Sequence, residues 1–142
     1  MSEQPEFFCD ITKQINGVYE EYAKSMGLSY TSLYVLHMIA LSENCTQKYI
    51  AEQMYLPKQT VNSVISAFCK QGLVELTELP EDRRHKGLHL TEKGHELADK
   101  ILPQIERAEH CSMAQFNDNE REMLFSLIRR YAQVFSKELV HK

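Results

Sequence analysis

The chain has 142 residues, of which 43% are hydrophobic and 25% charged, and its net charge is −4. This length and composition predict one soluble globular domain that folds without disulfides or a structural metal. No apolar run reaches the roughly 18 residues that a membrane span requires, and the acidic N-terminus lacks the pattern of a signal peptide. We therefore expect a cytoplasmic protein that does not insert into a membrane.

Catalytic and metal-binding motifs are missing from the sequence. It contains no Gly-rich phosphate loop, nucleophile elbow or HExxH motif, so we predict neither an enzyme nor a bound cofactor. Four cysteines are present without a CxxC spacing, which argues against a zinc ribbon. His85 and His89 are four residues apart but have no evident third ligand, so no metal site is predicted.

Residues 6–26 are predicted to form a first helix, because apolar side chains recur along them every three or four residues. The members of this stripe are Ile11, Ile15, Val18, Tyr22 and Met26. Gly27 suits the left-handed conformation that ends many helices, so we expect the helix to stop there. A second helix then begins with Ser29 or Thr31 as its N-cap and extends to about Ser42.

The next segment has the pattern of a helix-turn-helix. Thr46 is a suitable N-cap for a short helix that ends before Pro57, and a second helix extends from about Lys58 to Gln71. The second helix combines an apolar inner face with a polar outer face. The inner residues are Val61, Val64, Ile65 and Phe68, and the outer ones include Lys58, Gln59, Thr60, Asn62, Ser63 and Ser66.

A β-hairpin with a basic tip is predicted after Gly72. Residues 73–78 alternate in polarity, which indicates a strand with one buried side, and residues 88–91 form the returning strand. The polar turn between them carries Arg83, Arg84, His85 and Lys86, and His89 follows in the returning strand.

Two helices follow the hairpin. The first extends from about Glu92 to Cys111 with Leu97, Ile101, Ile105 and Ala108 on its inner face, and Pro103 is expected to bend or break it. Residues 117–120 form a loop and N-cap before a last helix with a broad apolar stripe. The terminal helices carry more apolar surface than the small middle region can cover, so we predict a homodimer formed through the first and the last two helices.

The middle of the chain has the features of a DNA-binding surface. The net negative charge lies mainly in residues 1–43, which hold six Asp/Glu against two Lys/Arg, whereas residues 44–91 hold six Lys/Arg against five Asp/Glu. A B-form major groove, about 12 Å wide, admits one helix with short polar side chains. A neighbouring hairpin reaches the minor groove, where arginine is attracted to the negative potential of narrow A·T-rich stretches.

At the hairpin the chain resembles the MarR family of winged helix-turn-helix transcriptional regulators. The resemblance rests on the Asp82-Arg83-Arg84 turn, on Leu90-Thr91-x-x-Gly94, and on Leu73 directly after Gly72. Residues 46–52 and 27–30 resemble the family's first helix of the helix-turn-helix motif and the opening of its second helix. The similarity extends over nearly the whole chain.

The resemblance implies a mostly α fold with a small β-hairpin wing (α+β), in a dimer with interlocking terminal helices. Residues 6–44 and 92–142 would dimerise and residues 45–91 would bind a double-stranded operator with an inverted repeat. The major-groove contacts would be Lys58, Gln59, Thr60, Asn62 and Ser63, and those of the wing Asp82, Arg83, Arg84 and Lys86. Ser63 stands where the family often has arginine, which indicates a weaker phosphate contact or a different operator.

The regulatory signal is left open by the sequence. The resemblance implies a repressor that a small aromatic or lipophilic ligand, or an oxidant, releases from DNA. Tyr22, Tyr34 and His37 are candidates for a ligand cleft, with ordinary core packing as the alternative. Cys9 lies near the place of the reactive cysteine in redox-sensing members, but nothing nearby clearly lowers its pKa, which favours a structural thiol. The competing class is a winged-helix module that binds protein instead of DNA.

Overall fold

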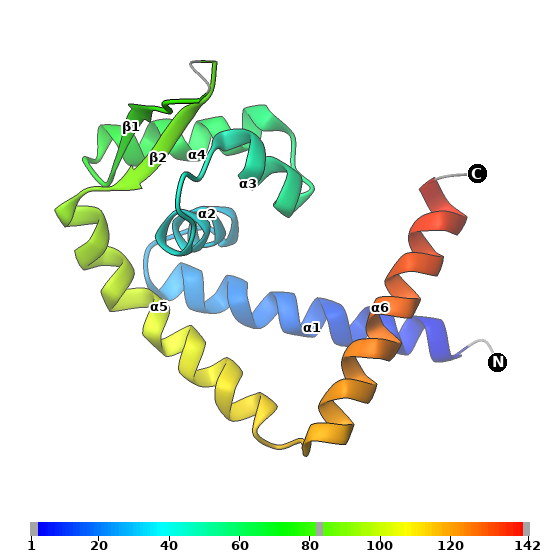
Figure 1. Cartoon of the computed structure of the whole chain (residues 1–142). Helices are drawn as coiled ribbons and strands as arrows, with labels where there is room; N and C mark the ends of the chain where they lie inside the picture. Colours follow the sequence, from blue (N-terminus) through cyan, green and yellow to red (C-terminus); the bar gives the residue numbers. More distant parts are fainter. Residues whose placement is uncertain (1–2, 82–83, 141–142) are drawn as a thin grey trace. The chain divides into compact units, whose positions relative to one another are not determined.

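The structure is a computed structural model that describes residues 3–81 and 84–140. Within them, six helices and one two-stranded antiparallel sheet follow one another along the chain (Figure 1). They are α1 (Glu3–Ser25), α2 (Tyr30–Leu41), α3 (Gln47–Met54), α4 (Lys58–Lys70), β1 (Val74–Glu78), β2 (Lys86–Leu90), α5 (Glu92–Met113) and α6 (Asp118–Val140). The chain divides into two compact units, Met1–Leu102 and Pro103–Lys142, and α5 belongs partly to each. The predicted mostly α chain with one hairpin is confirmed.

Side-chain caps define the starts of the two central helices. The Ser29 Oγ accepts a hydrogen bond from the Ser32 backbone N–H at 3.0 Å, so Ser29, and not Thr31, caps α2. The Thr46 Oγ1 accepts from the Tyr49 N–H at 3.1 Å and caps α3 as predicted. Each cap satisfies one of the backbone donors that the first helical turn leaves without a partner.

The core of the first unit is built around α2. This helix contacts α1, α4 and β2, and its Leu33, Val35, Leu36 and Ile39 are buried. Figure 1 shows α2 end-on beneath α3 and α4. The inner face of α4 is buried as predicted, except that Val64 is only half-buried. The helix-turn-helix is therefore fixed by its apolar back.

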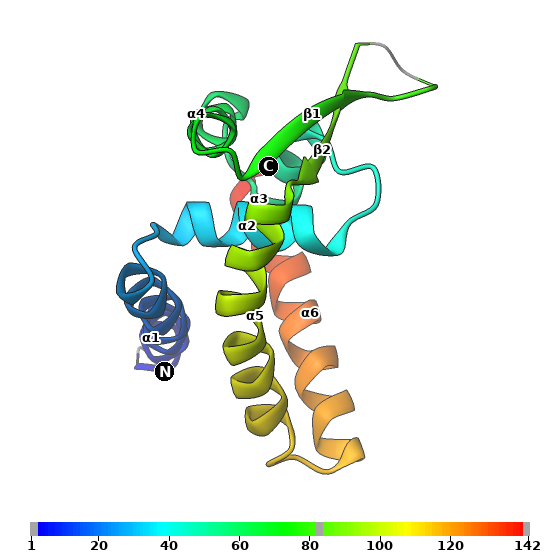
Figure 2. The ribbon, with the colours of Figure 1, turned by 90° about the vertical axis from the view of Figure 1, so that its left-hand side faces the viewer.

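The two strands of the hairpin reach this core to different extents. The register pairs Val74 with Leu90 at the base and Glu78 with Lys86 at the outer end. Val74 is buried, but Leu76, the next apolar residue of β1, is 51% exposed. The prediction that residues 73–78 have one buried side is wrong beyond Val74, because residues 75–78 of β1 are all exposed, whereas Leu88, opposite Leu76 on β2, is buried. Figure 2 shows the hairpin standing out from the helices.

The junction between the hairpin and α5 explains the Leu-Thr-x-x-Gly motif. The Thr91 Oγ1 accepts from the Gly94 N–H at 3.1 Å and donates to the Gly72 carbonyl at 2.6 Å, and the Thr91 N–H donates to the Leu73 carbonyl at 3.0 Å. A Cβ added at Gly94 would lie 2.0 Å from the Leu73 carbonyl oxygen. Glycine is therefore required because the backbone before β1 crosses the first turn of α5 at close range.

Two expectations for α5 need correction. The helix continues through Pro103, so the proline does not break it; the ring removes one backbone donor while the turns on both sides keep their bonds. Ala108 was expected to face inward but is exposed, whereas Ile101 and Ile105 are buried.

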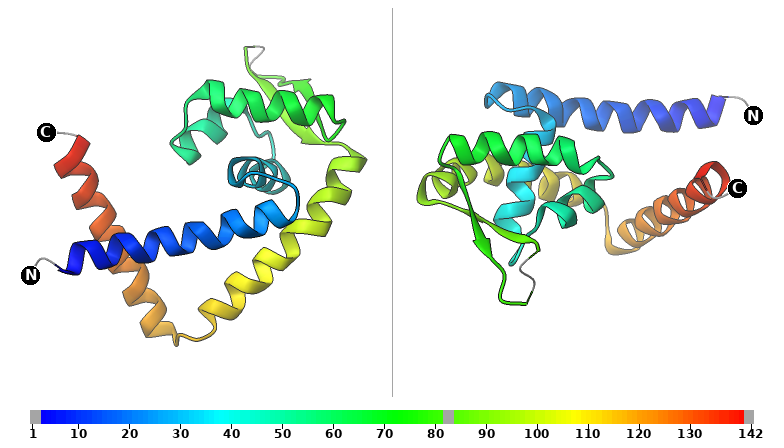
Figure 3. Two further views of the ribbon diagram at one scale, coloured as in Figure 1. Left: turned by 180° about the vertical axis from the view of Figure 1, so that it is seen from behind. Right: turned by 90° about the horizontal axis from the view of Figure 1, so that it is seen from above.

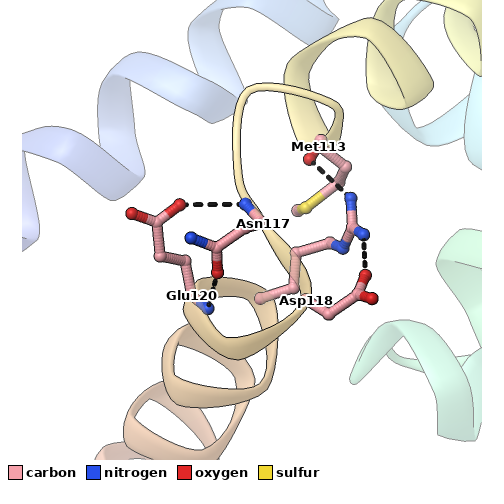
Figure 4. A network of polar contacts seen from close by, with 5 residues as sticks. Met113, Asn117, Asp118 and Glu120 are labelled. Carbon is pink, nitrogen blue, oxygen red and sulfur yellow. Dashed lines mark hydrogen bonds and ion pairs between the residues drawn. The ribbon is translucent and has the colours of Figure 1, made fainter.

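In the second unit, α6 begins with a reciprocal capping box (Figure 4). The Asn117 Oδ1 accepts from the Glu120 N–H, and the Glu120 Oε2 accepts from the Asn117 N–H, both at 2.9 Å. Arg121 donates to the Met113 carbonyl at 3.2 Å and pairs with Asp118. These contacts hold the turn between α5 and α6. No residue of α6, which is described throughout, is buried in the protomer.

Candidate nucleic-acid interface

The outer face of α4 is polar and exposed. All five predicted major-groove residues are exposed, and Ser66 extends the same face toward the C-terminal end. The Ser63 Oγ donates to the Gln59 carbonyl one turn earlier at 3.0 Å, so this hydroxyl is held against its own helix. The other polar side chains of the face carry charge, amide and hydroxyl groups of the types that contact base edges.

The N-terminal end of α4 is positioned by α3. The Gln47 Nε2, in the first turn of α3, donates to the Lys58 carbonyl at 2.9 Å. Pro57 precedes α4 and supplies no side-chain cap. The positive end of the helix dipole is thus left for an external anion, beside the charge of Lys58.

The hairpin provides further cations. Arg84 is exposed, and the Lys86 Nζ lies 3.2 Å from the Glu78 Oε1 across the outer end of the sheet. This ion pair joins the two strands where their last residues pair. Asp82 and Arg83, predicted as wing residues, lie outside the described part of the chain, and so does the proposed support of Arg84 by Asp82.

A groove of about 500 Å³ separates the polar face of α4 from the hairpin. In the view from above, Figure 3 shows the hairpin beginning at one end of α4 and running out from it at an angle. Three kinds of side chain line the groove: cationic or imidazole side chains, polar side chains and apolar side chains. It is lined by Lys48, Lys58, Arg84, His85 and Lys86, by Thr46, Gln47, Asn62 and Ser66, and by Ile65, Cys69, Leu76 and Leu88. A concave surface with this many cations attracts a phosphodiester backbone.

The groove unites predicted and unpredicted residues. Lys58, Asn62, Arg84 and Lys86 were predicted to contact DNA, and the fold places them around one hollow. Lys48 was not among the predicted DNA contacts. Its place in the first turn of the helix before α4 could have indicated that it lies beside the DNA-binding face. Leu76, expected on the buried side of the strand over residues 73–78, lines the groove because β1 leaves the core after Val74.

The groove is held to the core through the loop before α3. The Leu88 N–H donates to the Cys45 carbonyl at 2.7 Å, which joins this loop to β2.

The Cys45 thiol is buried, and burial raises its pKa to about 11 although a hydrogen bond with Ser42 lowers it in part. Cys69 is half-buried, while Cys9 and Cys111 are exposed. Cys45 is therefore a packing residue with a protonated thiol.

Aromatic rings form a row between α1 and α2. The ring centroids of Tyr19 and Tyr30 are 5.9 Å apart, and the steps from Tyr30 to Tyr34 and from Tyr34 to His37 are both 6.3 Å. Burial raises the pKa of Tyr30, and Tyr34 and Glu20 raise it further. Of the predicted cleft residues, Tyr34 and His37 belong to this row. Tyr22 instead donates its hydroxyl to the Ile101 carbonyl at 2.8 Å and joins α1 to α5.

Other ligand classes find little support in the described residues. No three His, Cys, Asp or Glu side chains among them come together in a group that could hold a metal ion. None of the described helices combines the length and apolar character that crossing a membrane requires.

Comparison with known sequences supports this geometry. A family model described as MarR family matches residues 26–85. The transcriptional repressor YetL of Bacillus subtilis is 24% identical over 121 residues, which are 84% of this chain and 72% of YetL. The transcriptional regulator SarZ of Staphylococcus epidermidis is 30% identical over 90 residues, which are 63% of this chain and 61% of SarZ.

Comparison with solved structures extends the similarity to the full fold. NMB1585, a MarR family regulator from Neisseria meningitidis, superposes with a TM-score of 0.84 and 30% identity over 97% of each chain. MepR of S. aureus, solved as a DNA complex, has a TM-score of 0.78 at 15% identity over 91% of this chain and 94% of MepR, and shows the same fold. The chain therefore belongs to the MarR family of winged helix-turn-helix transcriptional regulators.

Proposed function

We propose that this protein binds operator DNA as a homodimer and represses transcription until a small ligand or a stress signal releases it. The cationic groove between α4 and the hairpin is the observation that carries the proposal. Residues 58–63 of α4 enter a major groove, Arg84 enters the neighbouring minor groove, and the lining cations contact the phosphates between them. Residues 45–91 thereby contact DNA.

Dimerisation is supported by apolar surface that the protomer leaves uncovered. In α1, Ile11, Ile15 and Val18 are exposed. In α6, large apolar side chains are exposed along the whole helix, and they are Met123, Phe125, Leu127, Ile128, Tyr131, Val134, Phe135, Leu139 and Val140. A patch of this extent marks a protein interface. The apolar faces of α1 and α6, within the dimerising segments 6–44 and 92–142, supply the interface, and two-fold symmetry requires half-sites about 10 base pairs apart.

Selection of duplexes from a random pool tests the proposal directly. We expect the purified protein to enrich an inverted repeat. Arg84→Ala should lower affinity for that duplex about 10-fold and reduce the slope of log K against log salt by about 0.9, the value for one phosphate contact. Lys100→Ala, which removes a charge from the exposed surface of α5, is the matched control and should leave both values unchanged. Enrichment of no inverted repeat would favour the protein-binding module.

Asn62 separates base recognition from phosphate binding. It is exposed on α4 and lines the groove. Asn62→Ala should change the preferred base at one position of each half-site, with a loss of roughly 1–3 kcal/mol on the original duplex. The salt slope should stay constant because no charge is removed. A uniform loss on all sequences would contradict base contact.

A ligand cleft at the aromatic row is our proposal for effector binding. Tyr30, Tyr34 and His37 present half-buried rings on one side of α2, which suits a small aromatic or lipophilic molecule. Benzoate and phenol serve as probes in thermal-shift measurements. Tyr34→Ala should abolish any shift that the wild-type protein shows, and a retained shift would place the effector elsewhere.

An oxidant sensor based on Cys9 is the second regulatory candidate. Its thiol is exposed on α1. Treatment with hydrogen peroxide should then release the wild-type protein from DNA and leave Cys9→Ser bound. Peroxide-sensitive release that persists in Cys9→Ser would eliminate this role.

A further inference from the structure

Three helices of the first unit end in the same hydrogen-bonded motif. After α1, the Gly27 N–H donates to the Lys24 carbonyl at 3.1 Å and the Leu28 N–H to the Ala23 carbonyl at 2.9 Å. After α4, Gly72 and Leu73 repeat this pair of bonds at 3.0 and 2.9 Å, and after α3, Tyr55 and Leu56 do so at 3.4 and 3.1 Å. This pair of bonds is the Schellman motif. The first of its two donor residues, here Gly27, Tyr55 or Gly72, adopts the left-handed conformation.

Tyrosine is the unusual residue among these three. Gly27 and Gly72 have φ values of +77° and +72°, which glycine adopts without strain, whereas Tyr55 adopts +53°. Asn44, the other described non-glycine residue with positive φ, is of a type that tolerates this conformation. A large side chain with a Cβ is disfavoured there, so the helix end itself does not explain the tyrosine.

Packing does not explain it either. Tyr55 is 95% exposed, and no hydrogen bond or ring contact of its side chain with other described residues is present. The protomer thus retains a strained backbone and an uncovered ring together. Strain of this kind persists where a residue serves a binding function.

The position of Tyr55 indicates what the ring contacts. It lies in the turn between α3 and α4, with only Leu56 and Pro57 between it and Lys58, the first residue of α4. Phosphates line both walls of a major groove, so the turn before a helix whose N-terminal end enters that groove faces the backbone of one strand. Tyrosine hydroxyls donate hydrogen bonds to phosphate oxygens in such interfaces.

We infer that Tyr55 is a DNA-backbone contact outside α4 and the hairpin, donating its hydroxyl to a phosphate oxygen at the edge of the major groove. The inference rests on the proposed operator binding. Because the side chain is neutral, the contact adds affinity on every sequence without adding to the salt dependence. It also explains why a strained residue type is retained at this helix end.

Three variants test the inference, and for the first of them we expect stability and DNA affinity to change in opposite directions. Tyr55→Gly should keep or raise Tm by about 3 °C, because the strain is relieved and no packing is lost. The same variant should lose about 10-fold in affinity, equally for the enriched duplex and for a scrambled duplex, with an unchanged salt slope. Tyr55→Phe, which removes only the hydroxyl, should lose about 3-fold. Asn44→Gly makes a matched backbone change and should leave affinity unchanged.

The outcomes separate this inference from the proposed function. If the wild-type protein binds its enriched duplex and Tyr55→Gly binds equally well, Tyr55 is not a contact and the inference is overturned while operator binding stands. A loss of affinity confined to one duplex would also overturn it, since a phosphate contact acts on all sequences. Failure of the wild-type protein to bind any duplex would overturn both.

Discussion

The two compact units of the chain differ in where they place their apolar side chains. In residues 3–81 and 84–102, the helices and the hairpin bury almost all of the core, including Leu36, Ile50 and Leu88. In residues 103–140, Ile105 is the only buried large apolar side chain, and α6 buries none. Both units nevertheless contain amphipathic helices with similar apolar stripes.

This difference shows that an apolar stripe identifies a packing face without identifying its partner. The stripe of α4 packs within the protomer and leaves the polar face outside. The stripe of α6 stays uncovered, although each large apolar side chain gains roughly 1.5–3 kcal/mol when it is buried. The first unit thus buries its own core, and in our proposal it contacts DNA while the second unit supplies surface for a second copy of the chain.

Charge inserted into the α6 stripe should have the largest effect. Leu127→Glu places a carboxylate in the centre of the proposed dimer interface. We expect the variant to sediment as a monomer in sedimentation-velocity experiments. Its operator affinity should fall by about 100-fold or more, because one dimer no longer binds both half-sites together. The far-ultraviolet circular dichroism should change little, because the first unit keeps its own core.

Gln133→Glu is the matched control for this change. It introduces the same side chain on the polar face of α6, where it should leave the dimer intact. A dimeric Leu127→Glu protein with normal affinity would show that the exposed stripe of α6 has another purpose.

Adding one methyl group at Gly94, by substitution with alanine, should show how tightly the first unit is packed. Gly94→Ala brings a Cβ to within 2.0 Å of the Leu73 carbonyl oxygen, so the junction of the hairpin and α5 must shift. We expect a loss of about 3 kcal/mol in the free energy of unfolding, measured by urea denaturation.

Gly17→Ala is the corresponding change where the protomer has space. A Cβ at Gly17, in the middle of α1, meets nothing within 4 Å. Alanine should therefore stabilise the helix by about 1 kcal/mol. Similar effects of the two alanines would contradict the close approach at Gly94.

Thiol labelling should give the smallest but most direct contrast between the units. Burial raises the pKa of the Cys45 thiol to about 11, so this buried thiol is protonated at pH 8, whereas Cys111 of the second unit is exposed. Iodoacetamide should label Cys111 rapidly and Cys45 at least 100-fold more slowly, as followed by mass spectrometry of peptides. Rapid labelling of Cys45 in the native protein would mean that the first unit opens easily.

The same thiol makes a prediction for alkaline pH. The folded state holds the Cys45 proton more tightly than the unfolded chain, because burial raises the pKa from 9.0 to about 11. Its contribution to stability is therefore complete below about pH 9 and is lost as the pH rises to about 11. Cys45→Ala should show less of this decline in urea denaturation.

Local features of the fold were predictable from the sequence. Helix caps such as Thr46 and helix ends such as Gly72 depend on bonds within a few residues, so their residue types report them directly. The polar face of α4 and the basic turn after β1 were predictable for the same reason. Together with the resemblance at residues 90–94, these features were sufficient to identify the fold class.

Tertiary structure alone decided which of these local elements meet. Periodicity identifies the apolar face of a helix or strand, but burial depends on whether another element covers that face. Leu76 was expected on the buried side of its strand and instead lines the groove with Lys48, because β1 leaves the core after Val74. Tyr22 was expected in a ligand cleft and instead bonds to the α5 backbone, a contact between residues far apart in the chain.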